Sequence, residues 1–222
     1  MALGTHWEWR GFGDVSDFFT KRYGRLNYQY GPQELQDSYI WIPESNLNLK
    51  IRAGAGGGLK FKRFMGKDDR LEQWSEEPVD LFDFPLQEPA WQSLAGELAK
   101  ANLALGSYPE HPPGREQLLA ALEKAGCKTV PVNKQRWGRW WQGPNGRVLV
   151  EWTTIQKPQP ILTISLESQD TAVEGDWLTD EQAKVDVRAA ISMLSLKQEP
   201  LRVMNYTDAL AIWAQGTIIT GS

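Results

Sequence analysis

Hydrophobic and polar residues alternate along residues 46–63, NLNLKIRAGAGGGLKFKR, on both sides of a glycine-rich turn. The side chains of a β-strand point to opposite faces with a period of two residues. One face of a predicted hairpin therefore carries Leu47, Leu49, Ile51, Leu59 and Phe61. The other face carries Asn48, Lys50, Arg52, Lys60 and Lys62. The pattern predicts two antiparallel strands with one apolar face and one face rich in cations.

The same period recurs in other segments of the chain. Strands are expected at residues 6–12, 36–42, 70–77, 133–141, 147–155 and 160–168. Helical spacing of apolar residues predicts helices at residues 14–23, 91–106, 115–126, 179–195 and 206–216. Thr179 and Gln182 form a capping-box pattern at the start of the fourth helix. Strands, two helices, further strands and final helices follow one another, which is typical of an α+β fold.

The chain contains no low-complexity linker and no repeat of fixed period. We therefore expect one domain over residues 1–222, with a helical insertion near 91–126 and C-terminal helices near 179–216. About eight antiparallel strands are expected to close into a tunnel-like β-barrel with flanking helices, because closure removes exposed strand edges. If the cationic face of the hairpin points inward, the interior of this barrel is charged.

The composition argues against several classes of protein. The formal net charge is −4, which disfavours nucleic-acid binding by bulk charge. No apolar run approaches the roughly 18 residues needed to cross a bilayer, and the first residues, MALGTHWEWR, show no secretory signal. The single cysteine, Cys127, excludes a disulfide framework and fits a reducing compartment. We expect a cytoplasmic protein that binds neither nucleic acid nor membrane, with its oligomeric state left open.

The distribution of charge among the strands indicates a more specific role. Cations gather in residues 48–62 and 134–136, whereas Glu8, Glu151 and Glu167 come from three other strands. An ordinary solvated sheet face also alternates polar with apolar residues, but it would mix both signs along each strand. Lysine and arginine bind phosphate oxygens, and grouped carboxylates bind hard divalent cations. The pattern therefore favours a site for a polyanion together with a divalent metal ion.

Several segments, taken in order, resemble the CYTH domain of the triphosphate tunnel metalloenzymes. DSYIWIPESNLNLKIRAGAGGGLKFKR is similar to the tyrosine-containing strand of that family and the basic strands that follow it. RLEQW is similar to its Arg-x-Glu-x-Glu strand, and NKQRW to its Lys-x-Arg strand. RVLVEWTTI and ILTISLES stand where the family has acidic strands, and NYTDALAI resembles its C-terminal helix. The resemblance spans roughly residues 6–214.

This resemblance implies a barrel whose tunnel binds a small anionic ligand, a triphosphate or tripolyphosphate. It implies that the substrate is bound by Arg10, Lys50, Arg52, Lys60, Lys62, Arg70, Lys134 and Arg136. It also implies that Glu8, Glu151 and Glu167 are the catalytic residues and hold Mg²⁺ or Mn²⁺. Most members of the family hydrolyse a triphosphate and others cyclise ATP. Because this sequence shows no base-binding pattern, metal-dependent hydrolysis is the expected activity.

The sequence departs from the family at two motifs. The family's Glu-x-Glu-x-Lys is here HWEWR at residues 6–10, and its later Glu-x-Glu is SLE at residues 165–167. Two carboxylates on the metal side are thus replaced, and His6 either compensates as a ligand or serves the fold. One alternative is a barrel that binds phosphate-rich ligands or a partner without turnover. Another, suggested by the eleven tryptophans, is a lipocalin-like barrel that binds an apolar ligand or a chromophore.

Overall fold

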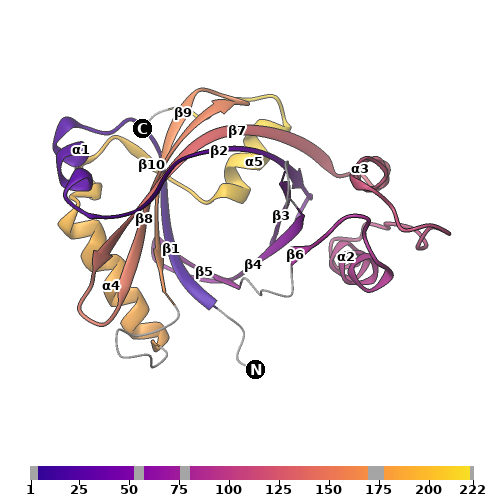
Figure 1. Cartoon of the computed structure of the whole chain (residues 1–222), viewed down its shortest axis with the longest axis horizontal. Coiled ribbons are helices and arrows are strands. Elements are labelled where there is room, and N and C mark those ends of the chain that lie inside the picture. The colour runs from indigo at the N-terminus through magenta and orange to yellow at the C-terminus, as the bar shows by residue number, and fades with distance from the viewer. Residues whose placement is uncertain (1–4, 53–57, 76–80, 170–177, 221–222) are drawn as a thin grey trace.

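Eight antiparallel strands close into a barrel, which confirms the fold class predicted from the sequence (Figure 1). The computed structural model describes residues 5–52, 58–75, 81–169 and 178–220. The barrel strands are β1 (Thr5–Gly13), β2 (Asn27–Trp41), β3 (Leu47–Arg52), β4 (Leu59–Asp68), β5 (Leu71–Ser75), β7 (Lys128–Gln142), β8 (Arg147–Lys157) and β9 (Ile161–Ser168). Their order around the barrel is β1-β5-β4-β3-β2-β7-β8-β9, and pairing of β9 with β1 closes the ring. The short strands β6 (Leu81–Phe82) and β10 (Leu201–Val203) pair with β4 and β1.

The helices of the described residues lie outside the ring of strands. They are α1 (Asp17–Gly24), α2 (Glu88–Lys100), α3 (Arg115–Lys124), α4 (Asp180–Met193) and α5 (Tyr206–Ala214), with a short 3₁₀ helix at Leu196–Gln198. Helices α1 and α4 cover one side of the barrel, and α2 and α3 lie at the opposite side (Figure 1). Helix α5 lies across one end of the barrel, where Tyr206 and Trp213 pack against Phe12.

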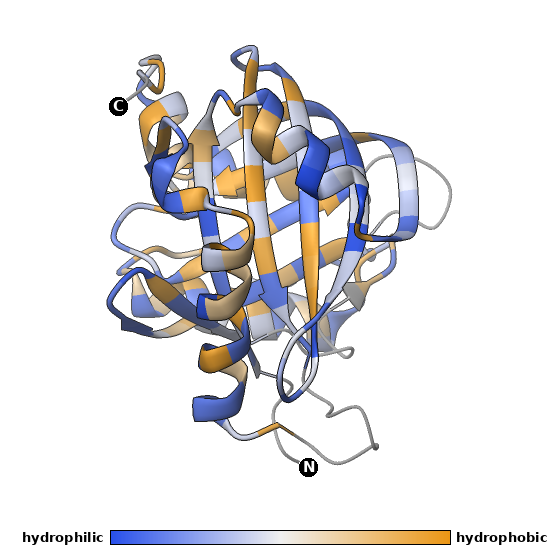
Figure 2. Cartoon of the chain, turned by 90° about the vertical axis from the view of Figure 1, so that its left-hand side faces the viewer, coloured by the Kyte–Doolittle hydropathy of each residue, from blue (hydrophilic) through white to orange (hydrophobic). Residues whose placement is uncertain are grey.

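On the two sides of the barrel that helices cover, the apolar face of the strands points outward to the helices. On one side, Val150 of β8 and Leu166 of β9 pack with Val187 of α4. On the other side, Leu49 of β3 packs with Leu94 of α2. A third apolar cluster, with Phe12 of β1, Tyr39 of β2 and Val132 of β7, packs against α5 at one end of the barrel. The resulting alternation of hydrophobic and hydrophilic residues is visible along the strands in Figure 2. Because burial of apolar surface is the main favourable term in folding, the helices decide which face of the sheet becomes the interior.

Strand β2 is longer than the sequence predicts. The strand expected at residues 36–42 begins at Asn27 and spans 15 residues. The Gly31-Pro32 dipeptide reads as a turn in sequence, but here it lies at an irregularity in the pairing of β2 with β7. Proline lacks an N–H for the ladder and is tolerated at bulges of this kind. The extension adds Tyr30 and Gln33 to the barrel wall.

The ends of other elements agree with the sequence patterns or adjust them slightly. Helix α4 begins with the predicted capping box, in which the Thr179 hydroxyl accepts a 3.2 Å hydrogen bond from the Gln182 N–H. Arg70, expected on a strand, lies in the turn before β5. The glycine-rich turn at residues 53–57 lies outside the described residues. Within the described chain, no helix is long and apolar enough to cross a membrane.

Candidate functional site

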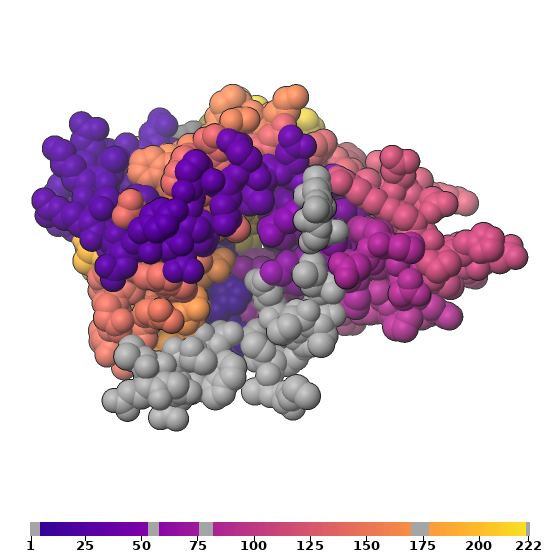
Figure 3. Space-filling model, viewed as in Figure 1, coloured from indigo at the N-terminus to yellow at the C-terminus, as the bar shows by residue number. Residues whose placement is uncertain are grey.

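A charged cavity of about 210 Å³ lies inside the barrel. The space-filling view shows a hollow near the centre of the molecule (Figure 3). Its cationic lining consists of Arg10, Lys50, Arg52, Lys60, Lys62, Lys134 and Arg136. Its acidic lining consists of Glu8, Glu151 and Glu167. The structure thus brings together every site residue proposed from the sequence except Arg70. A concave site with this excess of positive charge attracts anions.

Strand register explains how the alternation in sequence gathers these side chains. Tyr39, Lys50 and Lys60 are partners across β2, β3 and β4. Glu8 and Glu167 are partners across β1 and β9, although 159 positions separate them in the chain. Side chains in register on neighbouring strands point to the same face with their Cβ atoms about 5 Å apart. The inward face of each strand therefore contributes to the same cavity.

Glu8 is a buried carboxylate held between two cations. Its Oε2 accepts a 2.7 Å hydrogen bond from Lys62 Nζ, and its Oε1 accepts one of 2.8 Å from Arg10 Nε. Lys62 also lies 3.4 Å from Glu167 Oε1, so its ammonium bridges the two carboxylates. Burial alone would raise the pKa of Glu8, but Lys62 and Arg10 outweigh it and hold the pKa well below its usual range. Glu8 is therefore ionised at neutral pH.

His6 lies beside this pair with an unused ring nitrogen. Its Nε2 is 4.0 Å from Glu8 Oε2 and is buried without a hydrogen-bond partner among the residues that the structure describes. Burial, with help from the charge of Lys62, lowers the pKa of His6 to about 4, so the imidazole is neutral at pH 7. One ligand atom each from His6, Glu8 and Glu167 lies within 4.8 Å of the others. Two carboxylate oxygens and a neutral imidazole form a donor set that fits a divalent metal ion.

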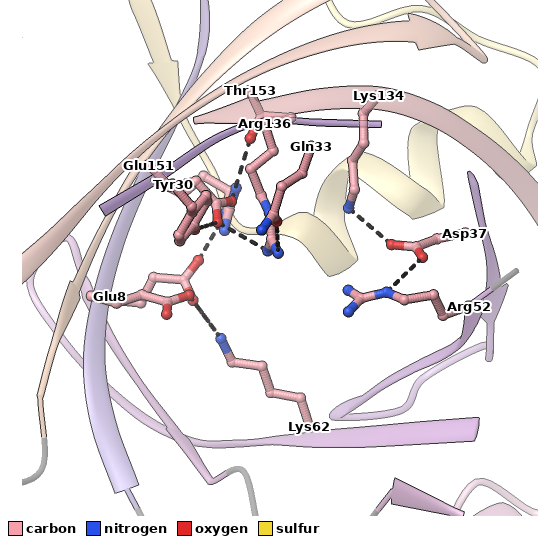
Figure 4. A network of polar contacts seen from close by, with 12 residues as sticks. Glu8, Tyr30, Gln33, Asp37, Arg52, Lys62, Lys134, Arg136, Glu151 and Thr153 are labelled. Atoms are coloured by element: carbon pink, nitrogen blue, oxygen red, sulfur yellow. Dashed lines mark hydrogen bonds and ion pairs between the residues drawn. The ribbon is translucent and has the colours of Figure 1, made fainter. Parts of the chain in front are cut away.

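Glu151 lies on another part of the cavity wall and has partners of its own (Figure 4). Its carboxylate accepts hydrogen bonds from Arg136 Nη1 at 3.1 Å and from the Tyr30 hydroxyl at 2.8 Å. Thr153 donates a third bond of 3.3 Å. Burial and the charge of Glu151 raise the pKa of Tyr30, which keeps its hydroxyl protonated as a donor. Of the three carboxylates proposed as metal ligands, the structure groups Glu8 and Glu167 with His6, whereas Glu151 binds Arg136 and Tyr30.

Asp37 is a fourth carboxylate at the site, and sequence reasoning missed it. It lies 3.1 Å from Lys134 Nζ and 3.2 Å from Arg52 Nε, with its side chain fully buried (Figure 4). Lys134 also donates a 2.8 Å hydrogen bond to the Tyr39 hydroxyl. Burial by itself would raise the pKa of Asp37, but the charges of Lys134 and Lys50 outweigh burial and hold the pKa below its ordinary value. The position could have been noticed in the sequence because Asp37 and Tyr39 are two residues apart on one strand face.

Lys50 and Lys60 are two cations of the cavity whose pKa lies below its ordinary value, mainly because of burial. The ammonium of Lys50 lies 5.7 Å from the centre of the Tyr39 ring, a cation–π contact. Burial, together with the charge of Lys134, lowers the pKa of Lys50 well below its ordinary value. Burial and Lys62 likewise lower the pKa of Lys60. A polyanion in the cavity would relieve both effects, because it would supply negative charge beside these groups.

Arg70 is exposed and lines a different hollow of about 410 Å³ together with Lys67 and Arg202. Glu8 and Arg10 line both spaces, so this second hollow adjoins the barrel cavity. Arg70 was expected on the same strand face as Glu72, but it lies in the turn before β5 begins at Leu71. Its side chain therefore does not follow the alternation of that strand. The structure therefore does not include Arg70 among the described residues that line the barrel cavity.

No family model matches this chain, and no curated protein matches it. Solved structures from three organisms are among those similar to it. A conserved hypothetical protein from Pyrococcus furiosus has 17% identity and a TM-score of 0.49, covering 91% of this chain and 98% of that chain. A protein from Pyrococcus horikoshii has 16% identity, a TM-score of 0.49 and the same coverage. A protein from Bacillus halodurans described as a "putative adenylate cyclase" has 13% identity and a TM-score of 0.47, covering 93% of this chain and 98% of that chain. By its own fold and cavity, this chain is an eight-stranded antiparallel barrel with a cationic interior.

Proposed function

We propose that the barrel binds a triphosphate or tripolyphosphate and hydrolyses it with the help of a divalent metal ion, as the CYTH-like sequence pattern implies. The observation that carries this proposal is the convergence of seven cationic side chains on one cavity that contains three carboxylates. A lipocalin-like role is disfavoured, because an apolar ligand would have to displace water from a cavity that seven cationic and three acidic side chains line.

The cations of β3, β4 and β7 would bind and align the phosphate chain. Lysine and arginine make short, charge-assisted hydrogen bonds to phosphate oxygens, and alignment with charge neutralisation is most of what phosphoryl transfer requires. Lys50, Arg52 and Lys60 are suited to this role because they line the cavity from the adjacent strands β3 and β4.

The acidic group at β1 and β9 would hold the metal ion, which when bound neutralises charge on the phosphate oxygens. Glu8 and Glu167 supply carboxylate oxygens, and His6 supplies a neutral nitrogen. In hydrolysis, the oxygen of water forms a bond to the terminal phosphorus and the bond from that phosphorus to the leaving diphosphate oxygen breaks. Protons of the attacking water pass to solvent or to a phosphate oxygen.

Two measurements test this function. The first is the melting temperature in millimolar tripolyphosphate, which should rise because a ligand that binds only the native state stabilises it. The rise should shrink in Lys60→Ala and Arg136→Ala. The second is phosphate release with Mn²⁺, Mg²⁺ or a chelator, which we expect to be metal-dependent and lost in Glu167→Gln while binding survives. The amide keeps the shape of Glu167 and removes only its charge.

A second candidate function is binding without turnover. The specific observation in its favour is the position of Lys62, whose ammonium bridges Glu8 and Glu167 and already neutralises the carboxylates that a metal would need. A protein that binds tripolyphosphate but releases no phosphate above the chelator blank would support this candidate. A melting temperature that does not respond to tripolyphosphate, with or without metal, would contradict both.

A further inference from the structure

The residue at the first position of the β1 motif is a histidine, and its surroundings are those of a ligand. His6 is 9% exposed, and its Nε2 faces the same oxygen of Glu8, Oε2, that Lys62 contacts. No residue in the described chain satisfies this nitrogen. A buried polar atom without a partner costs free energy, so an imidazole that serves only the fold would be expected to have a hydrogen-bond partner.

We propose that His6, Glu8 and Glu167 form a mixed nitrogen–oxygen site selective for divalent transition metals over Mg²⁺, and that the Lys62 ammonium competes with the metal for the two carboxylates. The inference rests on the proposed metal-dependent function for its place in the reaction. The metal affinity itself requires no phosphate, so it can be measured separately.

The distances are close to those of a metal centre. Ligand–metal bonds of about 2.1 Å place two ligand atoms between about 3.0 and 4.2 Å apart. His6 Nε2 and Glu8 Oε2 are 4.0 Å apart, and the whole set lies within 4.8 Å. Every separation is therefore at most about 0.6 Å above this range, a difference that small side-chain rotations can close. Arg10 holds the other oxygen of Glu8, so Oε2 is directed toward the site.

The donor set determines which metals are favoured. Mg²⁺ prefers oxygen ligands and dehydrates reluctantly, whereas imidazole nitrogen suits later, softer divalent ions. A site with one imidazole and two carboxylates therefore gains more from Mn²⁺, Co²⁺ or Zn²⁺ than from Mg²⁺. The same reasoning predicts that an oxygen ligand at position 6 would restore the preference for Mg²⁺.

The effect of Lys62 on metal binding should be opposite to that of His6. Lys62 Nζ lies 2.7 Å from Glu8 Oε2 and 3.4 Å from Glu167 Oε1, so the ammonium contacts the same two carboxylates that the metal ion would use. A divalent ion that binds Glu8 and Glu167 must displace this ammonium and is repelled by it. Removing the charge of Lys62 should therefore strengthen metal binding, whereas removing His6 should weaken it.

The test is a titration of the phosphate-free protein with Mn²⁺, followed by the loss of the free-ion electron paramagnetic resonance signal, and with Mg²⁺, followed by calorimetry. We expect wild-type protein to bind Mn²⁺ more tightly than Mg²⁺. His6→Asn should lower Mn²⁺ affinity by roughly tenfold or more, the scale of change when the support of a metal ligand is lost, and should leave Mg²⁺ affinity unchanged or higher. Lys62→Met should raise the affinity for both ions. His111→Asn, on an exposed loop, is the matched control and should change neither.

A wild-type measurement makes the test independent of the folding of any variant. The electron spin echo of bound Mn²⁺ should show coupling to a nitrogen nucleus, which only an imidazole ligand supplies in this donor set. Equal affinities for Mn²⁺ and Mg²⁺, absence of nitrogen coupling, or failure of Lys62→Met to raise affinity would each overturn the proposal. Because no phosphate is present, these outcomes are distinct from a failure to hydrolyse tripolyphosphate.

Discussion

The hydroxyl of Tyr30 donates a 2.8 Å hydrogen bond to Glu151 across the backbone of Gly138. Tyr30 on β2 pairs with Gly138 on β7, and Gly138 in turn pairs with Glu151 on β8. A Cβ atom at Gly138 would lie 2.4 Å from Cζ of the Tyr30 ring. The absence of a side chain at this position is therefore what lets the ring reach over one strand to the carboxylate.

Substitution of Gly138 should disturb the contact between Tyr30 and Glu151 in the cavity wall, because Gly138 lies on the strand between them. Gly138→Ala should displace the Tyr30 ring, break its bond to Glu151 and lower the free energy of unfolding by about 2 kcal/mol, the typical cost of crowding a packed site or losing a buried hydrogen bond. Denaturant unfolding measures this change. Gly66→Ala on β4 is the control, because a Cβ there meets nothing within 4 Å. Equal effects of the two substitutions would contradict the role of Gly138.

Asp37 should stabilise the free protein and oppose anion binding. Asp37→Asn leaves Lys134 and Arg52 without their shared counter-charge, so we expect a loss of about 3 kcal/mol or more in unfolding free energy. The same change frees two cations for phosphate oxygens, so the rise in melting temperature caused by tripolyphosphate should be larger than in wild type. Asp14→Asn, exposed before α1, makes the same charge change as a control. A smaller ligand-induced rise in Asp37→Asn would count against this assignment.

Lys50 should make stability depend on alkaline pH. Its pKa in the folded protein is well below the ordinary value of 10.5. Between these two values the unfolded chain binds more protons, so stability rises with pH across that window. Lys50→Met should therefore be more stable than wild type below the window, and the advantage should shrink as pH approaches 10.5. Thermal melts across this range, with Lys21→Met on α1 as the exposed control, measure the difference. A pH-independent difference would refute this explanation.

Ligand binding should also be accompanied by proton uptake at Lys50. A polyphosphate beside the ammonium favours its charged form and raises its pKa. Calorimetric titrations with tripolyphosphate in buffers of different ionisation enthalpy report the number of protons exchanged. In alkaline buffer, wild-type protein should take up more protons than Lys50→Met. Identical proton exchange by the two proteins would indicate that the ligand does not lie near Lys50.

Substitutions of Lys60 and Arg70 should show whether tripolyphosphate binds in the barrel cavity or in the neighbouring hollow. Lys60→Ala should reduce the stabilisation by tripolyphosphate, because Lys60 lines the barrel cavity. Arg70→Ala should leave it nearly unchanged, since Arg70 is exposed and lines the second hollow. The two substitutions remove one positive charge each, so a general effect of net charge would lower both equally. An equal loss would therefore assign the ligand to the surface or to both hollows.

Much of the candidate site could be predicted from local patterns. The period-two alternation fixes which side chains share a strand face, because a β-strand has no other choice of side-chain direction. Lys50 and Arg52, or Glu8 and Arg10, could therefore be paired from sequence alone. The first half of β2, which contains Tyr30, could not be predicted in the same way. It contains the Gly31-Pro32 dipeptide, and a proline at a bulge cannot be distinguished in sequence from a proline in a turn.

The sequence by itself determined the faces of the strands and the positions of most helices, because both depend on residues that are neighbours in the chain. Only the tertiary structure decided that the polar faces point inward, that Asp37 lies between Lys134 and Arg52, and that Glu8 meets Glu167 and His6. These relationships depend on register between strands far apart in sequence and on helices that cover the apolar faces. A shift of one residue in register would turn every side chain of a strand to the other face, so the pairing of distant strands, rather than any local pattern, made the cationic cavity.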